Sequence, residues 1–227
     1  MIGAVAVVVP AHDEEELLPT CLAALRRAAA QCGPAAGHLV VVADACGDRT
    51  VQRARQAGAD VLEIGARSVG AARAAGFGEV LRRTRHLDPA TVWLATTDAD
   101  TVVPPDWLTR QIHHAGQGWD AVVGTVEVGD WGGYPAHAGE LFTAHYDHGA
   151  GPHPHVHGAN LGMTAAAYLA AGGFRALRTA EDHALVQALA ATGQKILRSR
   201  DVTVLTSARR RARAPHGFSH LLTTLLR

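Results

Sequence analysis

The sequence has few of the features that mark secreted, membrane-spanning or nucleic-acid-binding proteins. Its three cysteines are widely spaced and form no CxxC pair, a pattern typical of free thiols in a reducing compartment. No apolar run reaches the roughly 18 residues that a spanning helix needs, and the first residues contain no basic leader. These absences favour a cytoplasmic protein.

The chain also lacks an excess of either charge. Its 21 Lys and Arg residues balance 21 Asp and Glu residues, so no overall field attracts nucleic acid or an anionic membrane. We therefore expect no nucleic-acid partner. With 227 residues, 48% of them hydrophobic, the chain is long enough to bury one full core.

The first hundred residues alternate between apolar runs and segments with helical spacing. Strands are expected at 4–10, 38–44, 60–65 and 90–100, with helices at 13–33, 46–59 and 68–85 between them. Continuously apolar strands between helices indicate an α/β fold, with a mainly parallel sheet covered on both faces. The ligand of such a sheet lies beyond the carboxyl ends of its strands, where the clusters PAHDEE, ADACGD and TTDAD fall.

The second half is less regular. Helices are expected at 104–118, 165–174 and 181–193, and strands within 120–131 and 195–207. The segment 132–162 is rich in Gly, Pro and His, and the pattern predicts no helix or strand within it.

Asp98 and Asp100 stand where the apolar run of the fourth strand stops. At the end of a strand, positions i and i+2 project to the same side, so both carboxylates can address one hard cation such as Mg²⁺ or Mn²⁺. The alternative is a turn or a helix cap before Pro104, because Asp favours such positions.

Taken in order, these motifs resemble the family 2 glycosyltransferases, which have the GT-A fold. VVVPAHDEEELLPTCLAAL is similar to their first strand and acidic turn, VVVADACGDRT to their nucleotide-base loop, and TTDADT to their DxD motif. Further on, GANLGMTAAAYLAAGGF and AEDHAL are similar to their acceptor-side segment and its Glu-Asp pair. The resemblance implies an open mixed, mainly parallel sheet in a single domain 1–227, with a nucleotide-sugar-binding half at 1–103 and an acceptor half with a C-terminal tail at 104–227.

The resemblance also implies an activity, which is metal-dependent transfer of a sugar, with inversion, from a UDP- or GDP-sugar to the hydroxyl of an unidentified acceptor. Carried over position by position, it places Pro10 and Glu14 at the nucleoside, Asp44 at the base or ribose, Asp98 at the ribose and metal, Asp100 at the metal, and Asp182 as general base.

The sequence departs from the family pattern in three places. Ala43 occupies the first of two acidic positions in the base-reading loop, and the family's ARN triplet appears as ARA, with Arg73 followed by Ala74 and Ala75. Asp13 stands where the family commonly has Asn. The first two departures leave the choice of nucleotide base and one donor contact open.

The chemistry of the reaction supports the same candidates. A departing nucleoside diphosphate gains negative charge, which a divalent cation stabilises most where water is excluded, and Asp100 is the first choice of ligand. The acceptor hydroxyl loses a proton as it attacks, and Asp182, at the start of an expected helix, suits the role of base. The alternative is that Asp182 offsets the helix dipole, as Glu181 does.

The segment GARSVGAARAAGFG lacks the spacing of a GxGxxG turn, so a dinucleotide-binding turn is not expected. Its small residues favour close packing of a helix on the sheet. Within the same segment, Arg67 or Arg73 is a candidate for contact with a donor phosphate.

Five histidines lie between residues 145 and 157, and imidazole is a common zinc ligand. No Cys joins them and their spacing matches no closed tetrahedral motif, which favours an acceptor-side loop over a zinc site. His216 is either a third metal ligand beside the Asp pair or a cap of the basic tail.

The tail gathers Arg209, Arg210, Arg211 and Arg213 before an apolar stretch with helical spacing. Three interpretations stay open: a lid whose arginines clamp the donor diphosphate, a helix that docks on the core, and a peripheral membrane contact through basic residues beside an amphipathic helix. The resemblance to the family favours the lid, because family 2 enzymes close a C-terminal segment over the nucleotide.

Two other functions remain open. A nucleotidyltransferase on a related α/β sheet also uses paired acids and a metal, although PAHDEEE is acidic where such enzymes carry a glycine-rich, basic phosphate loop. The second of these functions is that of a non-catalytic nucleotide-sugar-binding protein, because Ala43 and Ala75 remove expected contacts with the donor.

Overall fold

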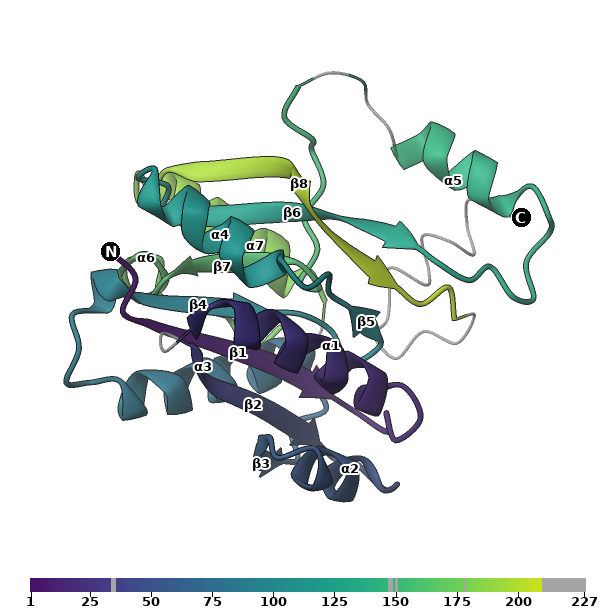
Figure 1. The fold of residues 1–227 in the computed structure, drawn as a ribbon, viewed down its shortest axis with the longest axis horizontal. Coiled ribbons are helices and arrows are strands. Elements are labelled where there is room, and N and C mark those ends of the chain that lie inside the picture. The colour runs from purple at the N-terminus through teal and green to yellow at the C-terminus, as the bar shows by residue number, and fades with distance from the viewer. Residues whose placement is uncertain (34–35, 147–148, 150, 178, 210–227) are drawn as a thin grey trace.

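The computed structural model describes residues 1–33, 36–146, 149, 151–177 and 179–209, which form one eight-stranded sheet in the order β3-β2-β1-β4-β7-β6-β8-β5 (Figure 1). The strands are β1 Ala4–Ala11, β2 Ala36–Asp44, β3 Asp60–Ile64, β4 Val92–Thr96, β5 Thr101–Val102, β6 Ala121–Val128, β7 Leu161–Thr164 and β8 Ile196–Thr206. The helices are α1 Leu18–Gln31, α2 Thr50–Gln56, α3 Val69–Arg83, α4 Trp107–Gly116, α5 Ala138–Tyr146, α6 Ala165–Ala170 and α7 Glu181–Ala191, with a 3-10 helix η2 at Pro89–Thr91.

The strands β1 to β4 pair in parallel, as the alternation in the sequence predicts. β7 runs antiparallel to β4 and β6, and β5 runs antiparallel to β8, whereas β6 and β8 are parallel. The expected α/β class and the mixed, mainly parallel sheet are therefore confirmed. Because β1, β2 and β4 are parallel, the loops that follow them emerge at one edge of the sheet, called the carboxyl edge below.

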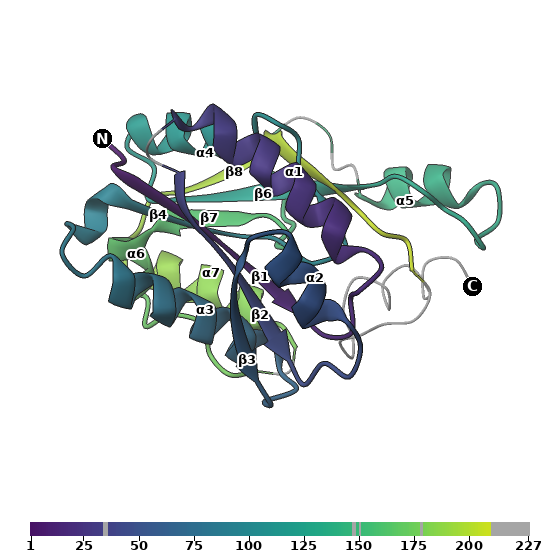
Figure 2. The ribbon, with the colours of Figure 1, turned by 60° about the horizontal axis from the view of Figure 1, so that its bottom comes forward.

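Helices cover both faces of the sheet, and β1 lies between them. Val5, Val7 and Val9 belong to the core beneath α1 and α4, whereas Ala6 and Val8 belong to the core beneath α3, α6 and α7. Figures 1 and 2 show the two helix layers from different sides. A strand that is buried on both faces has no polar side to present, which explains its continuously apolar sequence.

α3 packs against the sheet through the small residues that the sequence singles out. A Cβ on Gly76 would lie 2.3 Å from Cγ1 of Val8 and 2.9 Å from Cγ2 of Val42, so only glycine allows this approach. The helix begins after Ser68, whose hydroxyl accepts a hydrogen bond from the N–H of Ala71. The predicted close packing of this helix is confirmed.

The segment 132–162, in which the sequence pattern predicts no helix or strand, contains α5 and the first residues of β7. Aromatic packing stabilises α5, where Phe142 stacks on Tyr146 with 4.9 Å between ring centroids and lies 5.5 Å from Trp131. These contacts are made between side chains that come together only in the folded protein, and tertiary packing provides most of the stability of a short helix.

α1 begins later than expected, at Leu18, and no acidic residue lies in its first turn. The acidic residues form the preceding loop instead, because their backbone groups bind the loop after β2. The N–H of Glu14 donates to the hydroxyl of Thr50 at 2.7 Å, and the N–H of Glu15 donates to Asp48 at 3.0 Å.

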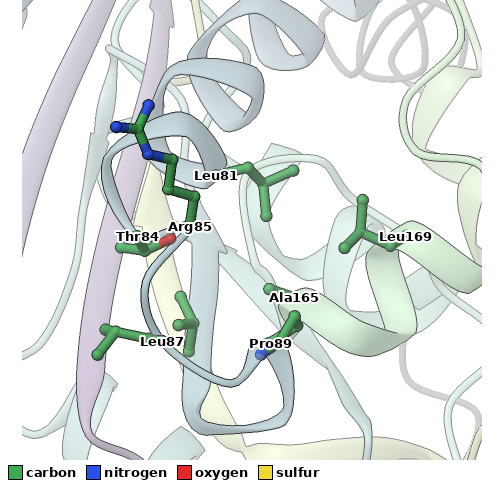
Figure 3. Close-up of a pocket in the computed structure, with 8 residues that line it drawn as sticks. Leu81, Thr84, Arg85, Leu87, Pro89, Ala165 and Leu169 are labelled. Carbon is green, nitrogen blue, oxygen red and sulfur yellow. The ribbon is translucent and has the colours of Figure 1, made fainter.

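A cavity of about 250 Å³ lies at the opposite edge of the sheet, beside the first residue of β4. Its walls come from the end of α3, the η2 region and α6, and Figure 3 shows the guanidinium of Arg85 directed away from the leucines that line it. The lining contains no carboxylate, imidazole or thiol. The acidic motifs that the sequence predicts as functional lie at the carboxyl edge.

Within the described residues, no helix combines the length and the apolar character that crossing a membrane requires.

Candidate active site at the carboxyl edge

The loops after β1, β2 and β4 meet at the carboxyl edge, as the sequence predicts. Asp13, after β1, accepts a hydrogen bond from the N–H of Gly47, after β2, at 2.7 Å. The thiol of Cys21 on α1 donates to the carbonyl of Asp98, after β4, at 3.4 Å. A hydrogen bond between two loops and one from α1 therefore bring all three polar clusters into one region.

Asp98 and Asp100 do not lie in a strand, and this corrects the geometry expected for them. β4 ends at Thr96, and the N–H of Thr101 donates to the carbonyl of Asp98 at 3.1 Å, which makes residues 98–101 a turn. The two side chains consequently bind different arginines, Asp98 to Arg73 and Asp100 to Arg209. Their joint binding of one cation stays a prediction.

Arg209 holds the first pair of acids. It donates to Glu14 and, at 3.0 Å, to Asp100, whose side chains are 5% and 8% exposed. Burial raises the pKa of Asp100 to about 6; Arg209 opposes this effect, and the charges of Asp98 and Glu14 add to it. The site therefore concentrates negative charge from the β1 loop and the DxD turn around one guanidinium. The predicted contact of Glu14 with a nucleoside stays untested.

Arg73 holds the second pair of acids. Its Nη1 donates to Glu181, the first residue of α7, and its Nη2 donates to Asp98 at 2.5 Å. Burial raises the pKa of Glu181, and the charge of Arg73 opposes that effect. At 2% exposure Arg73 presents no open surface to a donor in this structure, so the expected phosphate contact stays a prediction.

Asp182 is half-buried at the second position of α7. Its Oδ2 accepts the N–H of Gly158 and its Oδ1 accepts the N–H of His183, both at 2.8 Å. These two bonds fix the orientation of the carboxylate. The sequence predicts Asp182 as a functional residue, but the role of its neighbour Glu181 as a partner of Arg73 could not be seen in the motif.

Asp44 and Pro10 lie at the ends of β2 and β1. The carboxylate of Asp44 is 4% exposed and accepts the N–H groups of Arg67 and Ser68 at 2.8 and 2.7 Å, so it anchors the loop before α3. Pro10 is buried and lies beside Val42 in the strand register. Contacts of Asp44 and Pro10 with a donor nucleoside stay predictions.

Left-handed backbone conformations cluster at this edge. Among the described residues, the non-glycine residues with positive φ are Asp13, Ala45, Arg67 and Ala180, with φ of 52°, 55°, 49° and 58°. They follow β1, β2 and β3 and precede α7. Such conformations cost roughly 1–3 kcal/mol each, and proteins retain them mainly at functional sites.

Three histidines of the 145–157 segment, His153, His155 and His157, bind protein groups. Nε2 of His155 lies 2.7 Å from the carbonyl oxygen of Tyr146, and Nε2 of His157 lies 2.9 Å from the hydroxyl of the same tyrosine. Nε2 of His153 lies 3.0 Å from a carbonyl oxygen of β6. These contacts favour a packing role over a zinc site, and His148 lies outside the described residues.

A different group of potential metal ligands is present in the described part of the chain. Side-chain atoms of Asp13, Cys46 and Asp48 lie within 4.8 Å of one another in the loops after β1 and β2. Asp13 and Asp48 already accept hydrogen bonds from the N–H groups of Gly47 and Thr50, and burial raises the pKa of the Cys46 thiol. These features indicate a loop-stabilising cluster.

Three of the predicted tail arginines and His216 lie outside the described residues, which end at Arg209. The prediction that His216 is a third metal ligand is therefore not tested. The same holds for the expected lid and membrane contact.

Comparison with known proteins identifies a family and a fold. The family model described as Glycosyl transferase family 2 matches residues 6–177, which include the β1 loop, the β2 loop and the DxD turn. No curated protein matches the chain.

Solved structures share the fold at low sequence identity. Residues 1–349 of S. aureus TarS, in complex with UDP-GlcNAc, match with a TM-score of 0.65 and 13% identity over 98% of this chain and 65% of that one. The mannosyltransferase PcManGT from Pyrobaculum calidifontis, in complex with GDP-Man and Mn²⁺, matches with a TM-score of 0.67 and 20% identity over 93% of this chain and 59% of that one. This chain thus spans less than two thirds of the length of either structure.

A third structure is matched over more of its own length. Glucosyl-3-phosphoglycerate synthase from Mycobacterium tuberculosis, in complex with Mn²⁺, UDP and glucosyl-3-phosphoglycerate, matches with a TM-score of 0.54 and 17% identity. The match covers 96% of this chain and 74% of that one.

Proposed function

The chain belongs to glycosyl transferase family 2, and we propose that it transfers a sugar, with inversion, from a nucleoside diphosphate sugar to an acceptor hydroxyl. One observation carries the proposal. Five carboxylates, those of Glu14, Asp98, Asp100, Glu181 and Asp182, gather at the carboxyl edge around two arginines, where a ligand of an open α/β sheet binds.

This acidic region suits a divalent cation. Glu14 and Asp100 are buried and point at a common positive group, Arg209, and carboxylate oxygens are the ligands that Mg²⁺ and Mn²⁺ prefer. Asp100 would hold the cation, with Asp98 or Glu14 completing the protein's share of ligands. A bound cation would stabilise the negative charge of the departing diphosphate.

The donor is a UDP-sugar or a GDP-sugar. The similar structures support this class because they contain UDP-GlcNAc, GDP-Man with Mn²⁺, and UDP with Mn²⁺. The loops after β1 and β2, with Pro10, Glu14 and Asp44, are the expected nucleoside contacts. Ala43, in place of an acid, leaves the base to be determined by experiment.

Asp182 is the proposed base. As the acceptor oxygen bonds to the anomeric carbon, the bond from that carbon to the phosphate oxygen breaks, and its electron pair leaves with the nucleoside diphosphate. The acceptor proton passes to Asp182, an effect worth roughly 10²–10⁴ in rate. The N–H groups of Gly158 and His183 hold the carboxylate in place for this step. A single displacement with one base inverts the anomeric centre.

A thermal-shift panel tests the proposal. UDP-glucose, UDP-N-acetylglucosamine and GDP-mannose are each added with and without Mn²⁺. A ligand that binds only the native state and is present at 100 times its Kd stabilises that state by about 2.7 kcal/mol. We expect at least one of them to stabilise the protein in the presence of Mn²⁺. We also expect slow hydrolysis of that donor, in which water accepts the sugar and the nucleoside diphosphate is released. Stabilisation without release indicates a non-catalytic binding protein, and no stabilisation contradicts the proposal.

A further inference from the structure

Arg73 joins three segments of the site to α3. Its Nε donates to the hydroxyl of Thr96 at 3.3 Å, and its Nη1 and Nη2 donate to Glu181 and Asp98. The two acids lie 108 and 25 residues away along the chain. One buried side chain therefore ties the end of β4, the DxD turn and the start of α7 together.

The segment before β7 also depends on this guanidinium. A Cβ on Gly158 would lie 2.3 Å from Nη2 of Arg73 and 2.4 Å from its Cζ, so the arginine fills the space that a side chain at 158 would need. The N–H of Gly158 donates to Asp182. Glycine thus brings the backbone close to Arg73 and, at the same time, provides a donor that orients Asp182.

Stability alone does not account for this arrangement. The desolvation of a buried ion pair offsets much of its Coulomb attraction, and apolar residues of similar volume often serve as well. Burial lowers the pKa of Arg73, but Asp98, Glu181 and Asp182 more than compensate, so the net effect is a raised pKa and a charged guanidinium. The rigid fork of arginine binds carboxylates from two segments at a defined separation, which apolar residues and lysine do not.

We propose that Arg73 is a positioning residue, which sets the distance between Asp98 on the donor side and Asp182 on the acceptor side. It acts through Asp182, by fixing Glu181 next to it and the backbone of Gly158 against it. The inference rests on the proposed function and deepens it. It gives Arg73 a role that requires no contact with the donor.

Arg73→Lys tests the inference, because it keeps the charge and removes the fork. With Mn²⁺ and the nucleotide sugar that stabilises the wild-type protein in the panel, we expect kcat for nucleoside diphosphate release to fall about 100-fold. The Kd of the same donor, measured by calorimetry, should change by less than about threefold, since uniform binding is not what a positioning residue provides. Arg83→Lys, on the same helix but in more exposed pairs with Glu79 and Asp60, is the control and should change neither quantity.

The Asp182→Asn background separates positioning from general structural damage. A residue that acts through Asp182 has nothing left to position there, so Arg73→Lys should lower the residual kcat by less than about threefold. An equal loss in both backgrounds overturns the inference.

Hydrogen exchange provides a readout that is independent of turnover. The amides of Gly158 and His183 donate to Asp182, so Arg73→Lys should speed their exchange while the amides of β1 keep their protection. Faster exchange throughout the chain indicates a purely structural role and overturns the inference. If Arg73→Lys does not fold, Glu181→Gln removes the charge of the ion pair with Arg73 with little change in volume, and the same measurements decide.

The two proposals fail in different ways. Absence of donor binding by the wild-type protein contradicts the proposed function. If the wild-type protein releases nucleoside diphosphate from the donor and Arg73→Lys has the same kcat, only the positioning role is contradicted.

Discussion

Two arginines at the carboxyl edge each hold two carboxylates, but they do so under different conditions. Arg73 lies within α3 with a side chain that is 2% exposed, and it links Asp98 to Glu181. Arg209 follows β8 with a side chain that is 24% exposed, and it links Glu14 to Asp100.

The comparison indicates which positive charge can be exchanged. Withdrawal of Arg73 would leave Glu181 buried and unpaired, and an unpaired buried charge costs several kcal/mol. Arg209 lies at the end of a strand beside solvent, so an incoming cation can replace it at Asp100 without opening the core. The Arg73 side is therefore expected to be the fixed part of the site and the Arg209 side the exchangeable part.

The largest expected effect is on the Arg73 side. Asp182→Asn should reduce donor turnover by roughly 10²–10⁴, because an amide cannot accept the acceptor's proton. The Kd of the donor with Mn²⁺, measured by calorimetry, should stay within about threefold of the wild-type value, since the proposed base acts on the acceptor and not on the nucleotide. Near-normal turnover in this variant would assign the base to another residue.

On the Arg209 side, Asp100→Asn should weaken Mn²⁺ binding about 100-fold, or about 2.8 kcal/mol, because a neutral amide is a poor ligand for a hard cation. Calorimetry with Mn²⁺ in the absence of donor measures this directly. Asp106→Asn, which changes an exposed carboxylate after the same turn, is the matched control and should bind Mn²⁺ normally. Equal binding by both variants would contradict the assignment of Asp100.

At low pH, protonation of His157 should add a positive charge near Asp182, on the Arg73 side of the site. Burial lowers the pKa of His157 to about 4; Asp182 opposes this effect, and His155 and His183 add to it. A histidine with a lowered pKa in the folded state contributes stability above its ordinary pKa near 6.5 that is lost as the pH falls toward 4. We expect His157 to account for a loss of about 2 kcal/mol between pH 6.5 and pH 5. Asp100, whose raised pKa stabilises the folded protein as the pH falls, acts in the opposite direction, so the difference between the wild-type protein and a His157 variant measures the effect.

The pH dependence of urea unfolding checks this prediction. His157→Gln should flatten the stability profile between pH 6.5 and pH 5 relative to the wild-type protein. His113→Gln, which alters an exposed histidine on α4, should leave the profile unchanged. If the stability of His157→Gln falls with pH as steeply as that of the wild-type protein, the prediction is wrong.

The smallest expected effect has the opposite sign. Arg209→Gln should strengthen Mn²⁺ binding about tenfold, or about 1.4 kcal/mol, because it removes the positive group that competes for Glu14 and Asp100. Arg110→Gln, in an exposed pair with Asp106, should have no effect. Weaker Mn²⁺ binding by Arg209→Gln would show that the arginine supports the cation site and does not compete for it.

Much of the fold could be predicted from the sequence because local patterns specify it. The strands β1 to β4 are apolar runs bounded by helical segments, and the close packing of α3 depends on small residues such as Gly76 that are visible in the sequence. The convergence of the polar strand ends follows from the parallel sheet alone.

The pairing within the site could not be predicted in the same way. The turn at residues 98–101 directs Asp98 and Asp100 to different arginines, whereas the alternation rule for strands places them together. The role of Gly158 is visible only once Arg73 occupies the space beside it. Such contacts join side chains that lie 25 or more residues apart in the sequence, about which periodicity contains no information.

The edge strand β5 has a consequence for how the protein is made. Thr101 and Thr206 share a hydroxyl hydrogen bond across 105 residues, and Glu14 meets Arg209 across 195. During synthesis, β1 to β4 can associate while the ribosome is still adding residues. The described neighbour of β5 in the sheet is β8, so β5 cannot pair until β8 emerges. Pairings this distant along the chain form late in folding. A stalled or shortened nascent chain would therefore possess a folded core and an acidic edge that lacks Arg209, so its reaction centre would be the last part to mature.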